Sequence, residues 1–102
     1  MDAVPLKLTS RLDYQNLHGG LTALLYRHDP MGLAAAGCPE DEYGPEVSTI
    51  IPRLKDAKSP EDVRRIVHEE FLRWFGGKKT AGPESAYSGI ARDIWATFMD
   101  QQ

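Results

Sequence analysis

The residues best suited to chemistry gather in one short stretch, 28–46, of this 102-residue chain. The stretch opens with His28 and Asp29 and continues through Cys38, the only cysteine. A tyrosine and four further carboxylates follow, at Glu40, Asp41, Glu42, Tyr43 and Glu46. Such side chains can hold a metal ion, hydrolyse a bond through paired carboxylates, or attract a basic surface. Their spacing helps to choose between these uses.

The spacing does not favour a metal or a catalytic site. The chain has no His-x3-His, no Cys-x2-Cys and no calcium-loop pattern, so we expect no metal and no cofactor. His68 precedes two glutamates, but Leu72 stands where a zinc-protease helix carries its second histidine. Cys38 has no neighbouring base, and no serine lies in a nucleophile-elbow motif. We therefore expect no catalytic residue and predict that the chain is not an enzyme.

A purely structural interpretation of the same stretch is available. Asp29-Pro30-Met31-Gly32 meets the residue demands of a type I turn, in which the aspartate accepts hydrogen bonds from backbone amides. A helix must also stop at Asp29, because a residue before proline avoids the helical region. The acids that follow precede a predicted helix, whose dipole favours each by about 0.3–1 kcal/mol. In this interpretation the acids only cap helices.

In the binding interpretation, the same carboxylates point outward and attract a partner. Residues 1–51 hold three lysines and arginines against seven acids, whereas residues 52–102 hold nine against eight. The negative charge is thus concentrated in the first half, which suits a protein partner with a basic surface. The predicted contacts, with the tyrosine as a rigid anchor, are Asp29, Glu40, Asp41, Glu42, Tyr43 and Glu46.

Composition excludes several other classes of function. The net charge is −3 and the basic residues are interleaved with acids, so we expect no nucleic-acid binding. No apolar run approaches the roughly 20 residues of a membrane span, so we expect no membrane role. The first residues lack the features of a signal peptide, and a lone cysteine cannot form an intrachain disulfide. These features predict a cytoplasmic protein.

Hydrophobic periodicity predicts an all-α chain, a single small domain of about four helices arranged as an antiparallel bundle. The first helix carries Leu17, Leu21 and Leu24 on one face. Gly19 and Gly20 interrupt it, and each costs about 1 kcal/mol relative to alanine in a helix interior. We therefore expect this helix to fray, to kink, or to begin only near Leu21.

Three more helices are indicated by their end signals. The second has Gly44 as its candidate N-cap, and Pro52 interrupts its apolar stripe. The third runs from an N-cap at Ser59 to a terminator at Gly76, and the fourth opens at Pro83. No segment alternates well enough to be a strand.

The aromatic residues of the last two helices recur at helical spacing, and a domain this small needs them for its core rather than for a ligand pocket. They are Trp74, Phe75, Trp95 and Phe98. The single domain covers residues 1–102, with 1–10 as a poorly ordered extension and 76–83 as a flexible loop.

The segment from "DPMG" to "DEYGPEV" resembles the YugE-like family of small helical bacterial proteins of unknown function. The family pattern is Trp-Asp-Pro-Ile-Gly, then Asp-Glu-Tyr-Asp before an apolar helix, and the likeness covers roughly residues 21–75. This chain departs from the pattern at His28, Met31 and Gly44. The resemblance implies an all-helical bacterial cytoplasmic protein but supplies no activity. Similar small proteins occur beside toxin genes, which suggests an immunity-like role.

The leading hypothesis is a non-enzymatic protein-interaction module, specifically an immunity-type inhibitor that neutralises a toxin through an acidic surface. The alternative is a small metal-assisted or carboxylate-based hydrolase that uses His28, Asp29 and the acids at 40–42. The chain is expected to be a monomer, or a homodimer that pairs through an apolar strip of its last helix.

Overall fold

The structure, a computed structural model, describes residues 11–76 and 81–100. These residues form the helices α1 (Arg11–His28), α2 (Gly44–Leu54), α3 (Pro60–Phe75) and α5 (Ser88–Asp100), with a 3-10 turn, η1 (Glu84–Tyr87), before α5. No strand occurs within the described ranges, so the predicted all-α fold is confirmed. The predicted extension at 1–10 and residues 77–80 of the predicted loop lie outside the described residues.

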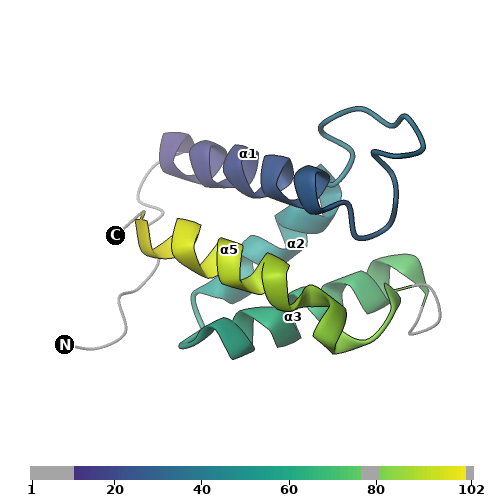
Figure 1. The fold of residues 1–102 in the computed structure, drawn as a ribbon. Helices are drawn as coiled ribbons and strands as arrows, with labels where there is room; N and C mark the ends of the chain where they lie inside the picture. The colour runs from purple at the N-terminus through teal and green to yellow at the C-terminus, as the bar shows by residue number, and fades with distance from the viewer. Residues whose placement is uncertain (1–10, 77–80, 101–102) are drawn as a thin grey trace.

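The four helices pack in a closed ring. Helices α1 and α3 each contact both α2 and α5. Figure 1 shows α5 beside α1 and α3 and running opposite to both, while α2 passes obliquely behind them. The long connection from α1 to α2 leaves this ring and forms a loop at one end of the molecule (Figure 1). In the described part of the chain, no helix is both long enough and apolar enough to span a membrane.

The core is built from the predicted apolar faces. Every helix contributes four or more buried apolar side chains, among them Leu21 of α1, Ile51 of α2, Val67 of α3 and Ile94 of α5. The aromatic residues depart from the prediction in one place: Phe98 is buried, but the Trp74 side chain is 45% exposed. Trp74 lies in the last turn of α3, and its indole N–H donates to the Thr49 hydroxyl on the surface of α2.

Helix α1 runs unbroken through its two glycines, so the expected kink or late start is wrong. Gly19 and Gly20 face solvent. Leu17 and Leu21, on the opposite side of the helix, are each only 1% exposed. Burying a leucine contributes about 1.5–3 kcal/mol, which outweighs the propensity cost of two glycines.

Helix α2 differs from the prediction at its start, and the proline near its end does not stop it. Its N-cap is Tyr43, so Gly44 is the first helical residue rather than the cap. Pro52 lies inside the helix, which nevertheless continues to Leu54. Pro52 has no backbone N–H and cannot donate the helical hydrogen bond to the carbonyl of Ser48. Both residues are exposed, so water can satisfy that carbonyl.

Helix α3 has the predicted ends. Ser59 is the N-cap, and its hydroxyl accepts a hydrogen bond from the Asp62 amide at 3.2 Å. The Asp62 carboxylate accepts in return from the Lys58 amide at 2.8 Å. Gly76 ends the helix with φ of 80°, a conformation that glycine adopts without strain.

The fourth helix begins later than predicted. Pro83 caps the 3-10 turn η1, and the α-helix starts only at Ser88. The residues just before this turn are held in place, because Nε2 of the buried His68 lies 2.8 Å from the Gly82 carbonyl oxygen.

The Ser59 cap can be tested by Ser59→Ala, which we expect to lower the free energy of unfolding by about 1 kcal/mol because the Asp62 amide loses its acceptor. This loss corresponds to roughly 4–8 °C in Tm for a domain of this size. Ser85→Ala removes an exposed hydroxyl from η1 and should change stability by less than about 0.5 kcal/mol. Equal effects of the two changes, measured by chemical denaturation, would contradict the capping role.

Candidate functional site

The loop between α1 and α2 starts at Asp29, which ends α1. Asp29 has φ of 52°, in the left-handed region, and its carbonyl oxygen accepts from the Gly32 amide at 3.1 Å. This bond closes the four-residue turn predicted for "DPMG". The Asp29 carboxylate accepts from the Ala34 amide at 2.8 Å and from the Ala35 amide at 3.0 Å. The aspartate thus folds the first half of the loop around its own side chain.

Tyr43, at the other end of the loop, completes this arrangement. Its hydroxyl donates to Asp29 Oδ1 at 2.8 Å and accepts from the Met31 amide at 3.1 Å. The tyrosine is fully buried, and its ring packs on Phe71 of α3 with centroids 6.1 Å apart. A second tyrosine, Tyr26, donates to the Cys38 carbonyl at 2.9 Å. The hydroxyls of these two tyrosines therefore hold the loop at three residues: Asp29, Met31 and Cys38.

The protonation equilibria of Asp29 and Tyr43 reflect these contacts. The amide of Ala34, helped by the Tyr43 hydroxyl, lowers the pKa of the Asp29 carboxyl below its usual value. Burial raises the pKa of the Tyr43 phenol to about 12. At neutral pH the pair is a carboxylate that accepts from a neutral phenol, which is the stronger kind of hydrogen bond.

The structure consequently changes the predicted set of partner contacts. Tyr43 is not the exposed anchor expected from the sequence, because its side chain lies in the core. Asp29 is part of the loop's internal framework, since both of its carboxylate oxygens already accept hydrogen bonds. The sequence did contain this signal, because the turn preference of Asp-Pro-x-Gly predicts an inward carboxylate.

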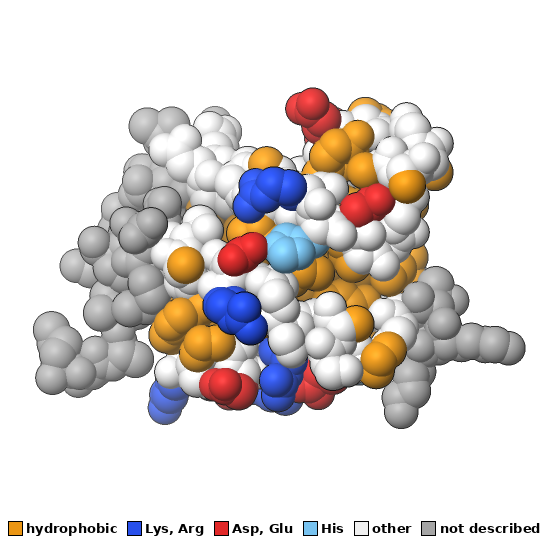
Figure 2. All heavy atoms as spheres, viewed as in Figure 1, with side chains coloured by type: hydrophobic (Ala, Val, Ile, Leu, Met, Phe, Trp, Pro, Cys, Tyr) orange, Lys and Arg blue, Asp and Glu red, His pale blue; other side chains and the backbone are white. Residues whose placement is uncertain are grey.

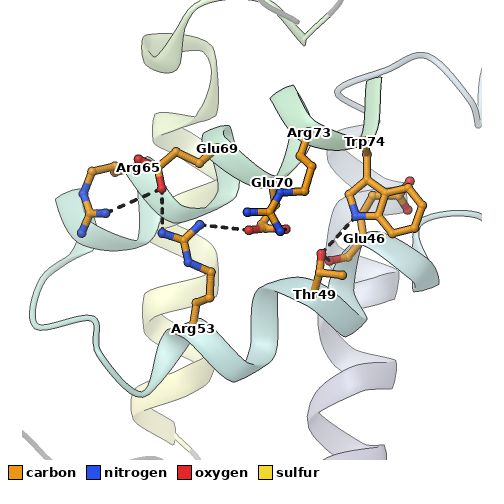
Figure 3. A network of polar contacts seen from close by, with 8 residues as sticks. All are labelled: Glu46, Thr49, Arg53, Arg65, Glu69, Glu70, Arg73 and Trp74. Carbon is orange, nitrogen blue, oxygen red and sulfur yellow. Dashed lines mark hydrogen bonds and ion pairs between the residues drawn. The ribbon is translucent and has the colours of Figure 1, made fainter. Parts of the chain in front are cut away.

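Glu46 is also turned inward. Only 6% of this residue of α2 is exposed, and its Oε1 has no hydrogen-bond partner among the described residues. Figure 3 shows it one turn from Thr49, whose hydroxyl donates to the Glu46 carbonyl and accepts from the indole N–H of Trp74 at 3.0 Å. Burial raises the pKa of the Glu46 carboxyl, and the nearby charge of Glu42 raises it further.

The remaining three predicted contacts, Glu40, Asp41 and Glu42, are exposed. We call them the acidic edge. Within the described residues, none of the three side chains has an ion-pair or hydrogen-bond partner. Their backbone is held by the loop, for example through the Glu42 amide, which donates to the Pro39 carbonyl at 3.0 Å. The acidic edge is therefore charged, accessible and mounted on an ordered loop.

Three acids outside the loop, Glu69 and Glu70 of α3 and Glu84 of η1, behave differently, because arginines pair with them. Arg53 of α2 donates to Glu69 at 2.6 Å and to the buried Glu70 at 2.9 Å, as Figure 3 shows. Arg64 donates to Glu84 at 2.9 Å. Figure 2 shows blue and red side chains mixed along the lower edge, over α3, but red and orange without blue over the loop that follows α1. Within the described residues, the acids of the acidic edge thus form no ion pair, although Arg27 lines a groove together with Glu40 and Asp41.

An open groove of about 560 Å³ lies beside the acidic edge. Its floor is the exposed face of α1, with Gly19 and Ala23, and its opposite rim carries Glu40 and Asp41. His18 stands at one end of the groove, where its Nε2 lies 3.1 Å from the Gly44 carbonyl oxygen. Sequence reasoning missed this groove; of the two glycines in the middle of α1, only Gly19 lines it.

The alternative hydrolase requires His28, Asp29 and the acids at 40–42 to converge. Instead His28 Nε2 lies 2.7 Å from the Asp93 carboxylate of α5, and Asp29 serves the loop backbone. In residues 11–76 and 81–100, no group of three or more histidines, cysteines and acids is placed to hold a metal ion. The geometry thus lends the hydrolase hypothesis no support.

Comparison of the chain with protein-family models, with curated proteins and with solved structures gave no match. The likeness of residues 21–75 to the YugE-like family therefore stays a prediction.

Tyr43→Phe tests the framework of the loop. The change leaves the Met31 amide without its acceptor and Asp29 without a donor, so we expect a loss of about 1–3 kcal/mol in the free energy of unfolding. Tyr14→Phe, in a half-buried tyrosine of α1 whose hydroxyl makes no hydrogen bond to the described residues, should cost less than about 0.5 kcal/mol. Denaturant titration of both variants compares them, and similar losses would refute the role given to Tyr43.

Glu46→Gln tests the buried carboxyl through the pH dependence of stability. Because the pKa of Glu46 is raised in the folded chain, the folded state binds more protons than the unfolded state at pH values just above 4.5. Its ionisation therefore lowers stability as the pH rises through that window. We expect Glu46→Gln to gain stability relative to the parent chain between pH 4.5 and pH 7.

Thermal unfolding across this pH range measures the effect, with Glu61→Gln supplying the baseline for the same change at an exposed residue of α3. If the difference between the Glu46→Gln variant and the parent does not change with pH, the burial of a charged Glu46 is refuted.

Proposed function

We propose that this chain is a non-enzymatic protein-interaction module whose acidic edge binds a basic surface of a partner protein. The observation that carries the proposal is the contrast among its acids. Glu69 and Glu70 of α3 and Glu84 of η1 pair with arginines of the chain, whereas the three consecutive acids Glu40, Asp41 and Glu42 are exposed and form no ion pair within the described residues. Three adjacent carboxylates repel one another unless a partner's cations lie between them.

The order of the loop supports a binding role. Glu40, Asp41 and Glu42 lie between the Cys38 carbonyl, which Tyr26 binds, and the buried ring of Tyr43. Carboxylates on an ordered backbone lose less conformational entropy on binding than carboxylates on a flexible tail. Their field also speeds the encounter with a cationic partner, most strongly at low salt.

A narrower form of the proposal is an immunity-type inhibitor in a bacterial cytoplasm, whose partner is a toxin with a basic active site. An acidic edge that covers such a site blocks access to it without chemistry of its own. What supports this form is the charge of the edge, together with the resemblance to the YugE-like family.

Charge reversal tests the proposal. Asp41→Lys/Glu42→Lys should weaken partner binding at least tenfold, which corresponds to about 1.4 kcal/mol. Asp56→Lys/Glu61→Lys changes the net charge equally at two exposed acids far along the chain, and should change binding by less than twofold. The partner is captured from the producing cell with the tagged chain, identified by mass spectrometry, purified and titrated by calorimetry.

The titration is repeated at about 50 mM and 200 mM salt, where screening should weaken the parent chain more than the Asp41→Lys/Glu42→Lys variant. Two results contradict the proposal: no partner is recovered, or both variants bind as the parent does. For the narrower form, co-expression of the parent chain should restore growth to cells that express the partner, and the Asp41→Lys/Glu42→Lys variant should not.

A further inference from the structure

We infer that the groove between α1 and the acidic edge receives a basic amphipathic α-helix of the partner, seated against Gly19 and Ala23 with lysines or arginines toward Glu40 and Asp41. This inference rests on the proposed function and names the element of the partner that the acidic edge recognises.

The shape of the groove favours an elongated occupant. Its lining extends from His18 to Arg27 along α1, which is about 14 Å at 1.5 Å per residue. That length equals about two and a half turns of a helix. The groove is open along its length and has a mostly apolar lining, as grooves that accept the apolar face of a helix do. A compact small molecule would leave most of this surface in water.

The glycine in the floor leaves room for a close approach by something outside the chain. A Cβ atom added at Gly19 would meet no atom within 4 Å, so nothing in the described fold requires a glycine there. Glycine in a helix interior costs about 1 kcal/mol relative to alanine. Gly19 and Ala23 are one turn apart and together leave a shallow floor, over which a second helix can pack closely.

The negative charge of the rim favours an occupant with positive charge. Glu40 and Asp41 on the rim are exposed and outnumber Arg27, the one arginine of the lining, so an occupant with cations on the side that faces the loop complements them. A second copy of this chain is a poor match, because the arginines of α3, its helix richest in arginine, already form ion pairs with Glu84, Glu69 and Glu70. A partner helix with free lysines or arginines is the better fit.

The test uses an 18-residue helical peptide of leucine and lysine with one apolar face, titrated into the ¹⁵N-labelled chain and followed by NMR. We expect saturable shifts at Gly19, Thr22 and Ala23. The same peptide with glutamate in place of lysine should produce none of them. Absence of saturable shifts with the lysine peptide, or shifts confined to other helices, overturns the inference.

Two matched variants separate the groove from general effects. Gly19→Leu fills the floor, whereas Gly20→Leu makes the same change at an exposed position that does not line the groove. Both changes raise helix propensity, so both chains should fold at least as stably as the parent. Gly19→Leu should weaken the peptide at least tenfold and Gly20→Leu less than twofold; equal effects overturn the inference.

Further outcomes distinguish this inference from the proposed function. If Glu40→Lys/Asp41→Lys abolishes peptide binding and Gly19→Leu does not, the acidic edge stands but the helix-in-groove arrangement is refuted. If Gly19→Leu abolishes binding and Glu40→Lys/Asp41→Lys has no effect, the part given to the acidic edge is refuted, and with it the basic character of the helix. If the same resonances shift with protein concentration alone, the occupant is a second copy and the inference is refuted.

Discussion

The phenol of Tyr43 lies where three segments meet, the end of α1, the start of α2 and the middle of α3. Its hydroxyl joins the Asp29 carboxylate to the Met31 amide, and its ring packs on Phe71. Because the side chain is fully buried, these hydrogen bonds form away from the competition of water. This contact joins the two ends of the connection from Asp29 to Tyr43, and the Tyr26 hydroxyl holds the same connection at the Cys38 carbonyl. Together these bonds mount the acidic edge on a fixed loop.

The acids of this chain have three different roles, although all are carboxylates. Asp29 and Asp62 accept from backbone amides and so shape the ends of helices. Glu69 and Glu70 bind Arg53 and connect α3 to α2. The acids of the acidic edge are of a third kind: three consecutive exposed carboxylates that form no ion pair or hydrogen bond within the described residues. A carboxylate already bound to an amide or a guanidinium gains little from a partner's cation, so the unpaired acids are the ones that favour binding.

The groove shows how stability and binding can make opposite demands on one position. Leucines on the inner side of α1 stabilise the helix enough for it to tolerate glycine on the outer side. The outer side can therefore carry small residues, as the proposed docking of a partner helix requires. The same face of α1 is joined to the start of α2 through His18 and to the loop through Tyr26, so the floor and the rim of the groove keep a fixed relation.

Much of the fold could be predicted because it depends on local preferences. The leucines of α1 recur at helical spacing, Ser59 and Gly76 mark the ends of α3, and the turn after Asp29 follows from its neighbours along the chain. Glu46 and Tyr43 could not be placed in this way. Residues on α3, far away in the sequence, surround them, and helical spacing does not say which face of α2 will meet which neighbour.

The sequence by itself determined the all-α class, the main helix ends and the excess of acid before α2, since each follows from residue types and short spacings. Only the tertiary structure decided which acids face inward, that Trp74 lies on the surface, and that a groove opens between α1 and the loop. The physical reason is that burial and pairing depend on contacts between segments distant along the chain. A carboxylate is drawn inward, neutralised or left free according to the donors that the fold brings to it.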